Sequence, residues 1–577
     1  MDKMLTCKEA ADLWNFTERW VSIMCKEGKI PGAVKQGHRW MIPADTRKPA
    51  DNRIKSGIYR KEGGPSNLPL PSGVSDYKRA CTEYYFVDKT FFIKEFLDQK
   101  PSVSVLLRPG RFGKSLMMDM LRVFFEKTDE DTSRYFQNRR IWSCGESYRR
   151  HQGIYPVIFL SFKGITFDTW GRSFRKFTDI IQYEYARHSV LATSEKLSSY
   201  ERSIYSVIAE GKADEIALSS SLFNLCRMLH EHYGREPVIL IDDYDIPLIE
   251  SRKYDYFDQL AFFLQNLFSG AFKDNPHLSF GILCGTHRFP SENLFRDYLT
   301  PRIFSVTDTV FSSAFGFTPD EAIQMAAYSG VETDPALLTD WYGGYGTTAE
   351  PLLNPWSTIS CLSGKGRIQP YWTSTGVSGI LRPLFRSGAF GAMEHLRTLL
   401  SGKPVRTQIE TDVQDPENPQ TLAEVYALLI NEGFLHVTGE EIRPNGMILY
   451  DLAFPNIEVT LCCRKELLSY LKEVQAIAAA PALQLEDALY TRSTGHFQKA
   501  LKQLLYESIR NHKEPNDEYY QSLFTGLMIL TEECYTVIES DTAGDNYDLI
   551  LKPKCEPMPE VKIEIKAGKT VKLLYSR

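Results

Sequence analysis

Gly-Lys-Ser at residues 113–115 follows the apolar run Val103–Leu107 and a short turn, and these residue types in this order suit phosphate chemistry. In such a loop, at the start of a helix, backbone N–H groups point at a phosphate and the lysine neutralises its oxygens. The serine hydroxyl suits Mg²⁺. Arg108 stands where the pattern G-x-x-x-x-G-K-[ST] has its first glycine, so Pro109 and Gly110 must supply the bend. An ordinary basic turn before a helix is the alternative interpretation.

A second apolar run, Pro237–Ile241, ends in carboxylates. Asp242 would bind Mg²⁺ or its water, and Asp243 occupies a position from which a carboxylate can orient an attacking water. A strand-end acidic turn explains either motif alone, but it explains less easily both in their proper order. Thr286 and Arg288 follow a further apolar run and either sense the γ-phosphate or belong to an ordinary surface loop. The candidate nucleotide-binding residues are Arg108, Pro109, Gly110, Arg111, Phe112, Gly113, Lys114, Ser115, Asp242, Thr286 and Arg288.

Carboxylates and a lysine near the end of the chain suggest a second metal site. Asp548 begins one strand-like run, and Glu564 and Lys566 lie in the next. In a metal-dependent nuclease the two carboxylates would hold Mg²⁺ and the lysine would position or activate water, with Glu539 as an extra upstream acid. The candidate catalytic residues are Asp243, Asp548, Glu564 and Lys566, and the candidate metal ligands are Ser115, Asp242, Asp548 and Glu564.

The first of these sites requires a sheet that brings strand ends together. Apolar runs at 103–107, 156–162, 238–241 and 278–284 are separated by helical stretches. This alternation predicts a multidomain α/β protein with a mostly parallel sheet and helices on both faces. Beyond residue 319 helical periodicity dominates, with an aromatic-rich patch that is either buried core or a platform for a base. That patch comprises Trp341, Tyr342, Tyr345, Trp356, Tyr371 and Trp372.

Seven separated motifs carry a resemblance to a known family. They are Gly73-Val-Ser-Asp-Tyr77, Tyr85-Phe-Val-Asp-Lys-Thr90, residues 108–115, Ile241-Asp-Asp-Tyr-Asp245, Phe315-Gly-Phe-Thr318, Trp341-Tyr-Gly-Gly-Tyr345 and Asn354-Pro-Trp-Ser357. From about Gly73 to its end the chain resembles the bacterial predicted AAA-ATPase family, whose members carry a PD-(D/E)XK nuclease-like domain at the C-terminus. The resemblance implies ATP and Mg²⁺ as ligands. For Asp88-Lys89-Thr90 the sequence suggests no mechanism.

Departures from the family pattern bear on both activities. Gly110 replaces an arginine, Asp243 replaces a glutamate that is one methylene longer, and Gly346 stands where an arginine is usual. Nucleotide binding is therefore better supported than hydrolysis. In the nuclease-like segment no arginine precedes Asp548, and the chain stops at Arg577 where relatives continue with another helix and strand. We expect this domain to be truncated and degenerate, an active metal-dependent nuclease being the alternative.

The first 47 residues resemble an excisionase/MerR-like winged helix-turn-helix. Thr6 and Glu9 form a capping box, a second helix starts at Thr17, and residues 30–43 alternate as a hairpin around Gln36-Gly37. Thirteen basic and eight acidic residues give residues 1–64 a formal charge of +5, whereas the whole chain carries −6. Duplex DNA is the expected partner, and a helical domain that contacts protein is the alternative. The candidate DNA-binding residues are Arg19, Ser22, Lys26, Lys35 and Arg39, with Glu18 and His38 beside them.

Composition sets the class of the whole protein. Of 577 residues, 43% are apolar and 24% charged, as in globular proteins of several domains. Eleven cysteines lack Cys-x-x-Cys spacing, and no apolar run reaches the roughly 18 residues of a membrane span. We therefore expect a cytoplasmic protein that neither spans a membrane nor carries a zinc cluster. A homo-oligomer is compatible with the sequence.

These observations together predict the domain order. We expect a winged helix-turn-helix at 1–47, a linker at 48–72, a P-loop AAA-ATPase-like domain at 73–318, a helical lid at 319–410, an α+β connector at 411–480 and a truncated PD-(D/E)XK nuclease-like domain at 481–577. The expected function is ATP binding with hydrolysis. The alternatives are a nucleotide-gated DNA-binding regulator that scarcely hydrolyses ATP, and a DNA-tethering protein whose enzymatic sites are relics.

Overall fold

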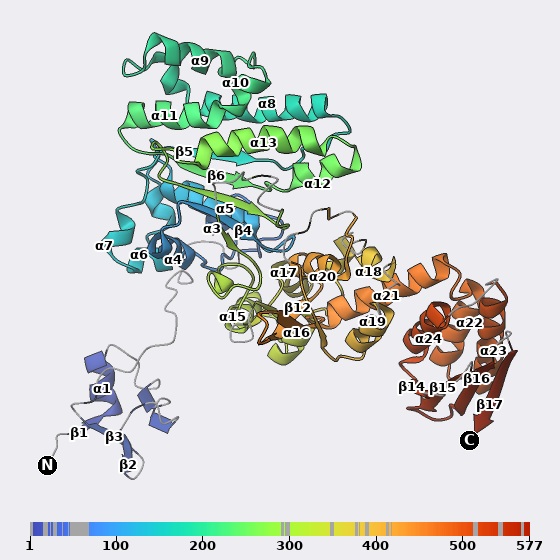
Figure 1. Cartoon of the computed structure of the whole chain (residues 1–577). Coiled ribbons are helices and arrows are strands. Elements are labelled where there is room, and N and C mark those ends of the chain that lie inside the picture. The colour runs from blue at the N-terminus through green and yellow to red at the C-terminus, as the bar shows by residue number, and fades with distance from the viewer. Residues whose placement is uncertain are drawn as a thin grey trace. The chain divides into compact units, whose positions relative to one another are not determined.

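The chain divides into two compact units, Met1–Gly64 and Pro65–Arg577, each of which is described by itself. A computed structural model (Figure 1) describes residues 4–14, 21–22, 25–26, 30, 32–36, 39–43, 46, 68–289, 294, 301–346, 351–375, 379, 381–386, 392–410, 413, 415–416, 418–511, 517–540, 546–566 and 570–576.

The first unit pairs helix α1 (Cys7–Trp14) with a small antiparallel sheet in the order β1-β3-β2. The predicted capping box is confirmed, because Glu9 accepts from Thr6 N and Thr6 Oγ1 at 2.8 Å while Glu9 N donates back to Thr6 Oγ1 at 3.3 Å. The predicted hairpin is present as β2 (Val34–Gln36) and β3 (Arg39–Pro43), whereas β1 (Met4–Thr6) was not predicted. Most of the expected second helix, with Glu18 and Arg19, lies outside the described residues, so the winged helix-turn-helix stays a prediction.

The second unit is built on a five-stranded, all-parallel sheet in the order β5-β6-β7-β4-β8. The four predicted strands are confirmed, and the short edge strand β8 adds to them. The strands are β4 (Val103–Leu107), β5 (Val157–Ser161), β6 (Val238–Asp242), β7 (Phe280–Gly285) and β8 (Arg302–Phe304). Strand β7 lies between β4 and β6, with Leu107 opposite Gly285 and Asp242 opposite Cys284. This register brings the carboxyl ends of three strands to one edge.

Helices cover both faces of this sheet (Figure 1). Side chains of Val105 and Ile241 point into one core with helices α8, α11 and α13, whereas Leu106 and Leu240 point into the other with α3, α4 and α5. This alternation follows from the two-residue repeat of a strand that is buried on both faces. The helices of this region are α3 (Tyr77–Glu83), α4 (Phe91–Gln99), α5 (Lys114–Phe125), α6 (Arg140–Ser143), α7 (Glu146–Arg149), α8 (Trp170–Arg187), α9 (Ser199–Ala209), α10 (Glu215–Ser219), α11 (Ser221–Tyr233), α12 (Ile246–Lys253) and α13 (Phe257–Phe272).

The rest of the unit is mainly helical, with one large core that runs from Trp372 to Ile563 and a separate smaller core formed mainly by residues between Phe317 and Leu362. The predicted helical stretch contains α15 (Pro319–Ser329), α16 (Pro335–Tyr342), α17 (Pro355–Ser363), α18 (Arg382–Arg386) and α19 (Ala392–Leu400), with the strand pair β9 (Tyr345–Gly346) and β10 (Pro351–Leu352). The predicted α+β connector contains α20 (Leu422–Asn431), α21 (Ile457–Glu473) and the antiparallel strands β12 (His436–Ile442) and β13 (Ile448–Ala453). Strand β11 (Val405–Thr407), which pairs with β13, lies instead in the stretch predicted to be a helical lid.

The C-terminal part packs helices against an antiparallel sheet in the order β14-β15-β16-β17. Its helices are α22 (Ala479–Tyr490), α23 (Thr494–Asn511) and α24 (Asp517–Thr531), and its strands are β14 (Tyr535–Ser540), β15 (Asn546–Pro553), β16 (Glu560–Lys566) and β17 (Thr570–Ser576). Strands β15 and β16 contain the two predicted runs, with Asp548 in one and Glu564 and Lys566 in the other, and β17 was not predicted. Nothing in this arrangement identifies a nuclease domain, which stays a prediction.

Candidate nucleotide-binding site

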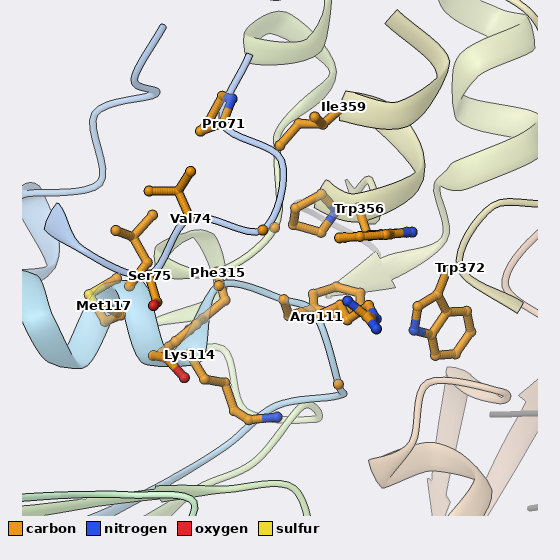
Figure 2. A pocket seen from close by; sticks show the side chains of 18 of the residues that line it. Pro71, Val74, Ser75, Arg111, Lys114, Met117, Phe315, Trp356, Ile359 and Trp372 are labelled. Carbon is orange, nitrogen blue, oxygen red and sulfur yellow. The ribbon is translucent and has the colours of Figure 1, made fainter. Parts of the chain in front are cut away.

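A cavity of about 630 Å³ lies at the carboxyl edge of the parallel sheet. Its floor is the loop after β4 together with the start of α5, and its walls come from residues 71–75, from Phe315–Phe317 and from helix α17. Figure 2 shows Lys114 on one side of this space, Arg111 near its middle and Trp356 over Arg111. Charged and apolar side chains therefore line the same cavity.

Lys114 is buried at the centre of the phosphate-type loop. Its Nζ donates to the carbonyl oxygens of Arg108 and Pro109 at 2.9 and 3.0 Å and to Thr286 Oγ1 at 2.9 Å. Gly113 adopts φ +84° as the N-cap of α5, a left-handed conformation that glycine enters without cost. The loop therefore curls around an ammonium group, with the first N–H groups of α5 at its rim.

Arg108 takes a different role from the predicted contact with the nucleotide. Its guanidinium is buried and donates to the carbonyl oxygens of Leu107, Phe304, Ser305 and Phe311 at 2.7 to 3.2 Å. It does not line the cavity and instead fastens the loop to the end of β8. Arginine at this position therefore replaces the usual glycine by supplying an anchor.

Two carboxylates at the end of β6 form the acidic side of the site. Asp242 is buried, and its Oδ1 has no hydrogen-bond partner in the described part of the chain. Burial raises the pKa of Asp242, and the Ser115 hydroxyl and the Lys114 ammonium oppose that rise. Asp243 lines the cavity, where burial and then the Asp242 charge raise its pKa to about 6. A buried oxygen without a partner, beside a serine hydroxyl, fits a Mg²⁺ ion.

Asp245 organises the loop after β7, a role that the sequence did not suggest. Its Oδ2 accepts from the backbone N–H groups of Thr286 and His287 at 2.7 and 2.8 Å. His287 is buried between Asp245 at 3.5 Å and Glu432 Oε1 at 3.0 Å. Burial disfavours the charge, but Glu432 and Asp245 raise the pKa of His287 to about 10. Through Thr286 this chain of contacts links Lys114 to the residue that ends α20.

The other sequence candidates in this region fall at different distances from the cavity. Gly110, Arg111, Phe112 and Ser115 line it, as does Thr286. Arg288 instead lines a small separate cavity beside α20, and Pro109 borders a second cavity on the other side of the loop. Thr286 is thus brought to the site, whereas Arg288 is not.

The motif Asp88-Lys89-Thr90 joins neighbouring elements. Asp88 Oδ1 accepts from Thr90 N and Oγ1 at 2.9 and 2.7 Å, and its Oδ2 accepts from Arg140 N at 2.7 Å. Lys89 donates to Glu321 Oε2 at 2.7 Å and to the Ser313 carbonyl at 3.0 Å. The motif therefore ties the start of α4 to α6 and to α15.

The aromatic-rich patch is mostly core. Tyr342 and Trp372 are buried, and Glu458 accepts from Ser357 Oγ at 2.7 Å and from the N–H of Trp372 at 2.6 Å. A Cβ at Gly344, whose φ is +80°, would overlap the carbonyl oxygen of Pro455. Core is the correct interpretation for most of these aromatics, although Trp356 and Trp372 also line the cavity.

The predicted nuclease carboxylates pair across two strands. Asp548 in β15 lies opposite Glu564 in β16, and Asn546 lies opposite Lys566. The Glu564 carboxylate contacts Lys562 Nζ at 3.0 Å and Lys572 Nζ at 3.8 Å. Among the described residues no group of three or more His, Cys, Asp or Glu side chains could hold a metal ion. The side chains of Glu539, Asp548 and Lys566 lie outside the described part.

The fold and the site together define a P-loop-like core, that is, a parallel sheet with a Gly-Lys-Ser loop after one strand and paired carboxylates after another. A family model described as "Predicted AAA-ATPase" matches residues 71–295, which supports the expected family for that region and suggests ATP binding. An "Uncharacterized protein in vnfD 5'region" from Azotobacter chroococcum mcd 1 is 27% identical over 435 residues, 74% of this chain and 74% of the relative. No solved structure gave a significant match.

The family match ends before the C-terminal domain and begins after the N-terminal unit. The winged helix-turn-helix and the nuclease-like domain therefore stay predictions. No helix among the described residues is long and apolar enough to span a membrane.

Proposed function

We propose that this protein binds ATP with Mg²⁺ in the cavity at the end of β4 and hydrolyses it. The observation that carries the proposal is the meeting of Lys114, Thr286 and the carboxylates of Asp242 and Asp243 at one edge of the parallel sheet. Parallel sheets bind their ligands at this edge. The family match over residues 71–295 supports ATP as the nucleotide.

Each residue has a distinct task in this proposal. The N–H groups at the start of α5 receive the phosphates, and Lys114 exchanges its carbonyl partners for phosphate oxygens. Ser115 and Asp242 would hold Mg²⁺, which neutralises phosphate charge. Asp243 accepts a proton from the attacking water, and Thr286 meets the terminal phosphate.

The test compares Lys114→Ala with wild type by thermal unfolding with ATP and Mg²⁺. Bound ligand stabilises the folded state in proportion to the logarithm of its concentration over Kd. We expect wild type to be stabilised and Lys114→Ala not, whereas Lys163→Ala, at the cavity wall but outside the loop, keeps most of the effect. Equal stabilisation of Lys114→Ala and wild type would overturn the proposal.

A nucleotide-gated regulator without appreciable hydrolysis is a second candidate. It is favoured by Asp243, whose side chain is one methylene shorter than the glutamate of the family pattern, so that any water it orients lies in a different place. Under this alternative ATP stabilises the protein but is not consumed. Measuring phosphate release beside thermal unfolding separates the two functions.

We infer that the first unit binds duplex DNA, since Lys26 and Lys35 are exposed on it and the segment carries an excess of positive charge. Arg39 lies in β3, but its side chain is outside the described part. Replacing both Lys26 and Lys35 by Ala in the full chain should weaken binding to duplex DNA and flatten its salt dependence. Lys8→Ala on α1 is the matched control. Unchanged binding in the double variant would favour a protein-contacting module.

A further inference from the structure

We propose that Arg111 is the residue that contacts the γ-phosphate of ATP and stabilises charge during its transfer, and that Trp356 holds this side chain when no phosphate is present. The inference rests on the proposed nucleotide site. It adds a catalytic arginine supplied by the phosphate loop itself, in a chain whose loop lacks the first glycine of the usual pattern.

The placement of Arg111 is the first observation. It lies three residues before Lys114 and is exposed at the cavity, and no other arginine of the described residues lines that space. Its φ of +63° is a left-handed backbone conformation that few residues other than glycine adopt. The loop therefore keeps a long cationic side chain at a position where the backbone would favour glycine.

The partner of Arg111 is the second observation. Its guanidinium lies 4.2 Å from the ring centroid of Trp356, the second residue of α17 (Figure 2). Among the described residues no carboxylate forms an ion pair with it, in contrast to Arg122 and Arg187, which pair with acids. A cation–π contact is weaker than a two-pronged hydrogen bond from guanidinium to phosphate. A bound triphosphate would therefore displace the Trp356 ring as the partner of the Arg111 side chain.

The chemistry of ATP hydrolysis gives Arg111 a role once its side chain contacts the γ-phosphate. Water attacks the γ-phosphorus, the bond between that phosphorus and the bridging oxygen breaks, and ADP leaves with the bonding electrons. The proton of the water passes to Asp243, and inorganic phosphate is the second product. Negative charge spreads over the γ-oxygens during transfer, and guanidinium N–H groups aimed at them lower the barrier.

The first experiment measures ATP and ADP affinity of the full-length chain by calorimetry. Because the contact is to the γ-phosphate, Arg111→Ala should weaken ATP binding by about tenfold or more and leave ADP affinity within about twofold. Arg111→Lys should recover part of the loss. Arg172→Ala, an exposed arginine paired with Asp168, is the control. If Arg111→Ala loses affinity equally for ATP and ADP, or for neither, the inference is overturned. If Lys114→Ala still loses all nucleotide binding in that case, the proposed function stands without the inference.

The second experiment uses Trp356 as a reporter. ATP should change tryptophan emission in wild type, ADP should change it less, and Trp356→Phe should remove the difference while Trp341→Phe on α16 keeps it. In Arg111→Ala the ATP-specific change should vanish. If that change persists in Arg111→Ala, the side chain does not leave the ring for the nucleotide.

A third measurement tests whether the arginine comes from the same chain. The rate of ATP turnover per chain should then not depend on protein concentration. A rise with concentration would point to a partner's arginine and contradict the proposal.

Discussion

Carboxylates and lysines lie close together in two regions of this protein, and their surroundings differ between the two. At the parallel sheet, Asp242 is buried with one oxygen unpartnered in the described part, and Lys114 is held only by carbonyl and hydroxyl oxygens. At the C-terminal antiparallel sheet, Glu564 already lies between Lys562 and Lys572. In the first region one carboxylate oxygen has no partner among the described residues, whereas in the second the carboxylate is paired with lysines.

The difference follows from how the strands run. Parallel strands place their carboxyl ends at one edge, where connecting loops can enclose a ligand. In the antiparallel sheet Glu564 contacts Lys562 on its own strand and Lys572 on a neighbouring strand, so its partners are side chains of the sheet itself. Carboxylates and lysines therefore lie around a cavity at one sheet and form a local charge cluster in the other.

The largest effect that we expect comes from replacing Asp243, the proposed base in the cavity. Asp243→Asn should lower the rate of ATP hydrolysis by about 10²-fold or more, since a positioned base contributes about that factor. Nucleotide affinity should change little. Asp320→Asn, an exposed acid in the first turn of α15, is the control. Full turnover in Asp243→Asn would remove Asp243 from the mechanism.

The pH dependence of the same reaction sharpens this test. Burial and the Asp242 charge raise the pKa of Asp243 to about 6. The base works only when ionised, so kcat/KM should rise about tenfold from pH 5 to pH 7 and then level off. In Asp243→Glu the rise should persist with a shifted midpoint, and in Asp243→Asn it should be absent.

The sequence predicted the elements of the cavity better than its contacts. Strand β4 has the predicted bounds, because its apolar run is flanked by Ser102 and by Arg108-Pro109. The role of Arg108 as an anchor was missed, since its partners at 304–311 belong to a short edge strand and a loop without apolar pattern. The contact of His287 with Glu432 was missed as well, because the two residues lie far apart in the chain. Local patterns predict strands and loops, whereas tertiary pairing decides which charges meet.

A smaller effect tests the charged link between the cavity and α20. Glu432 and Asp245 raise the pKa of His287 from 6.5 to about 10, so the folded state binds this proton more tightly than the unfolded chain does. The stabilisation is fully present below pH 6.5 and is lost as pH rises towards 10. Glu432→Gln should cost about 3 kcal/mol of unfolding free energy at pH 7 and reduce the further loss by pH 10.

The control for this link is Glu441→Gln, which breaks an exposed pair with Arg406. Such pairs contribute at most about 1 kcal/mol, so this variant should unfold almost as wild type does. If both variants lose the same stability, the buried triad has no special role.

The smallest expected effect concerns the second region, where we predict no nuclease activity. Metal-assisted cleavage needs carboxylates that are open to the ion, and the Glu564 oxygens lie beside two lysines that compete with a cation. Purified protein incubated with duplex or single-stranded DNA and Mg²⁺ or Mn²⁺ should leave both substrates intact, and Glu564→Ala should behave as wild type. Replacing Lys562 and Lys572 by Gln should increase Mn²⁺ binding if the lysines are what closes the site. Cleavage that disappears in Glu564→Ala but persists in Glu560→Ala, on the same strand, would show that this sheet is catalytic after all and that pairing with lysines does not silence a carboxylate.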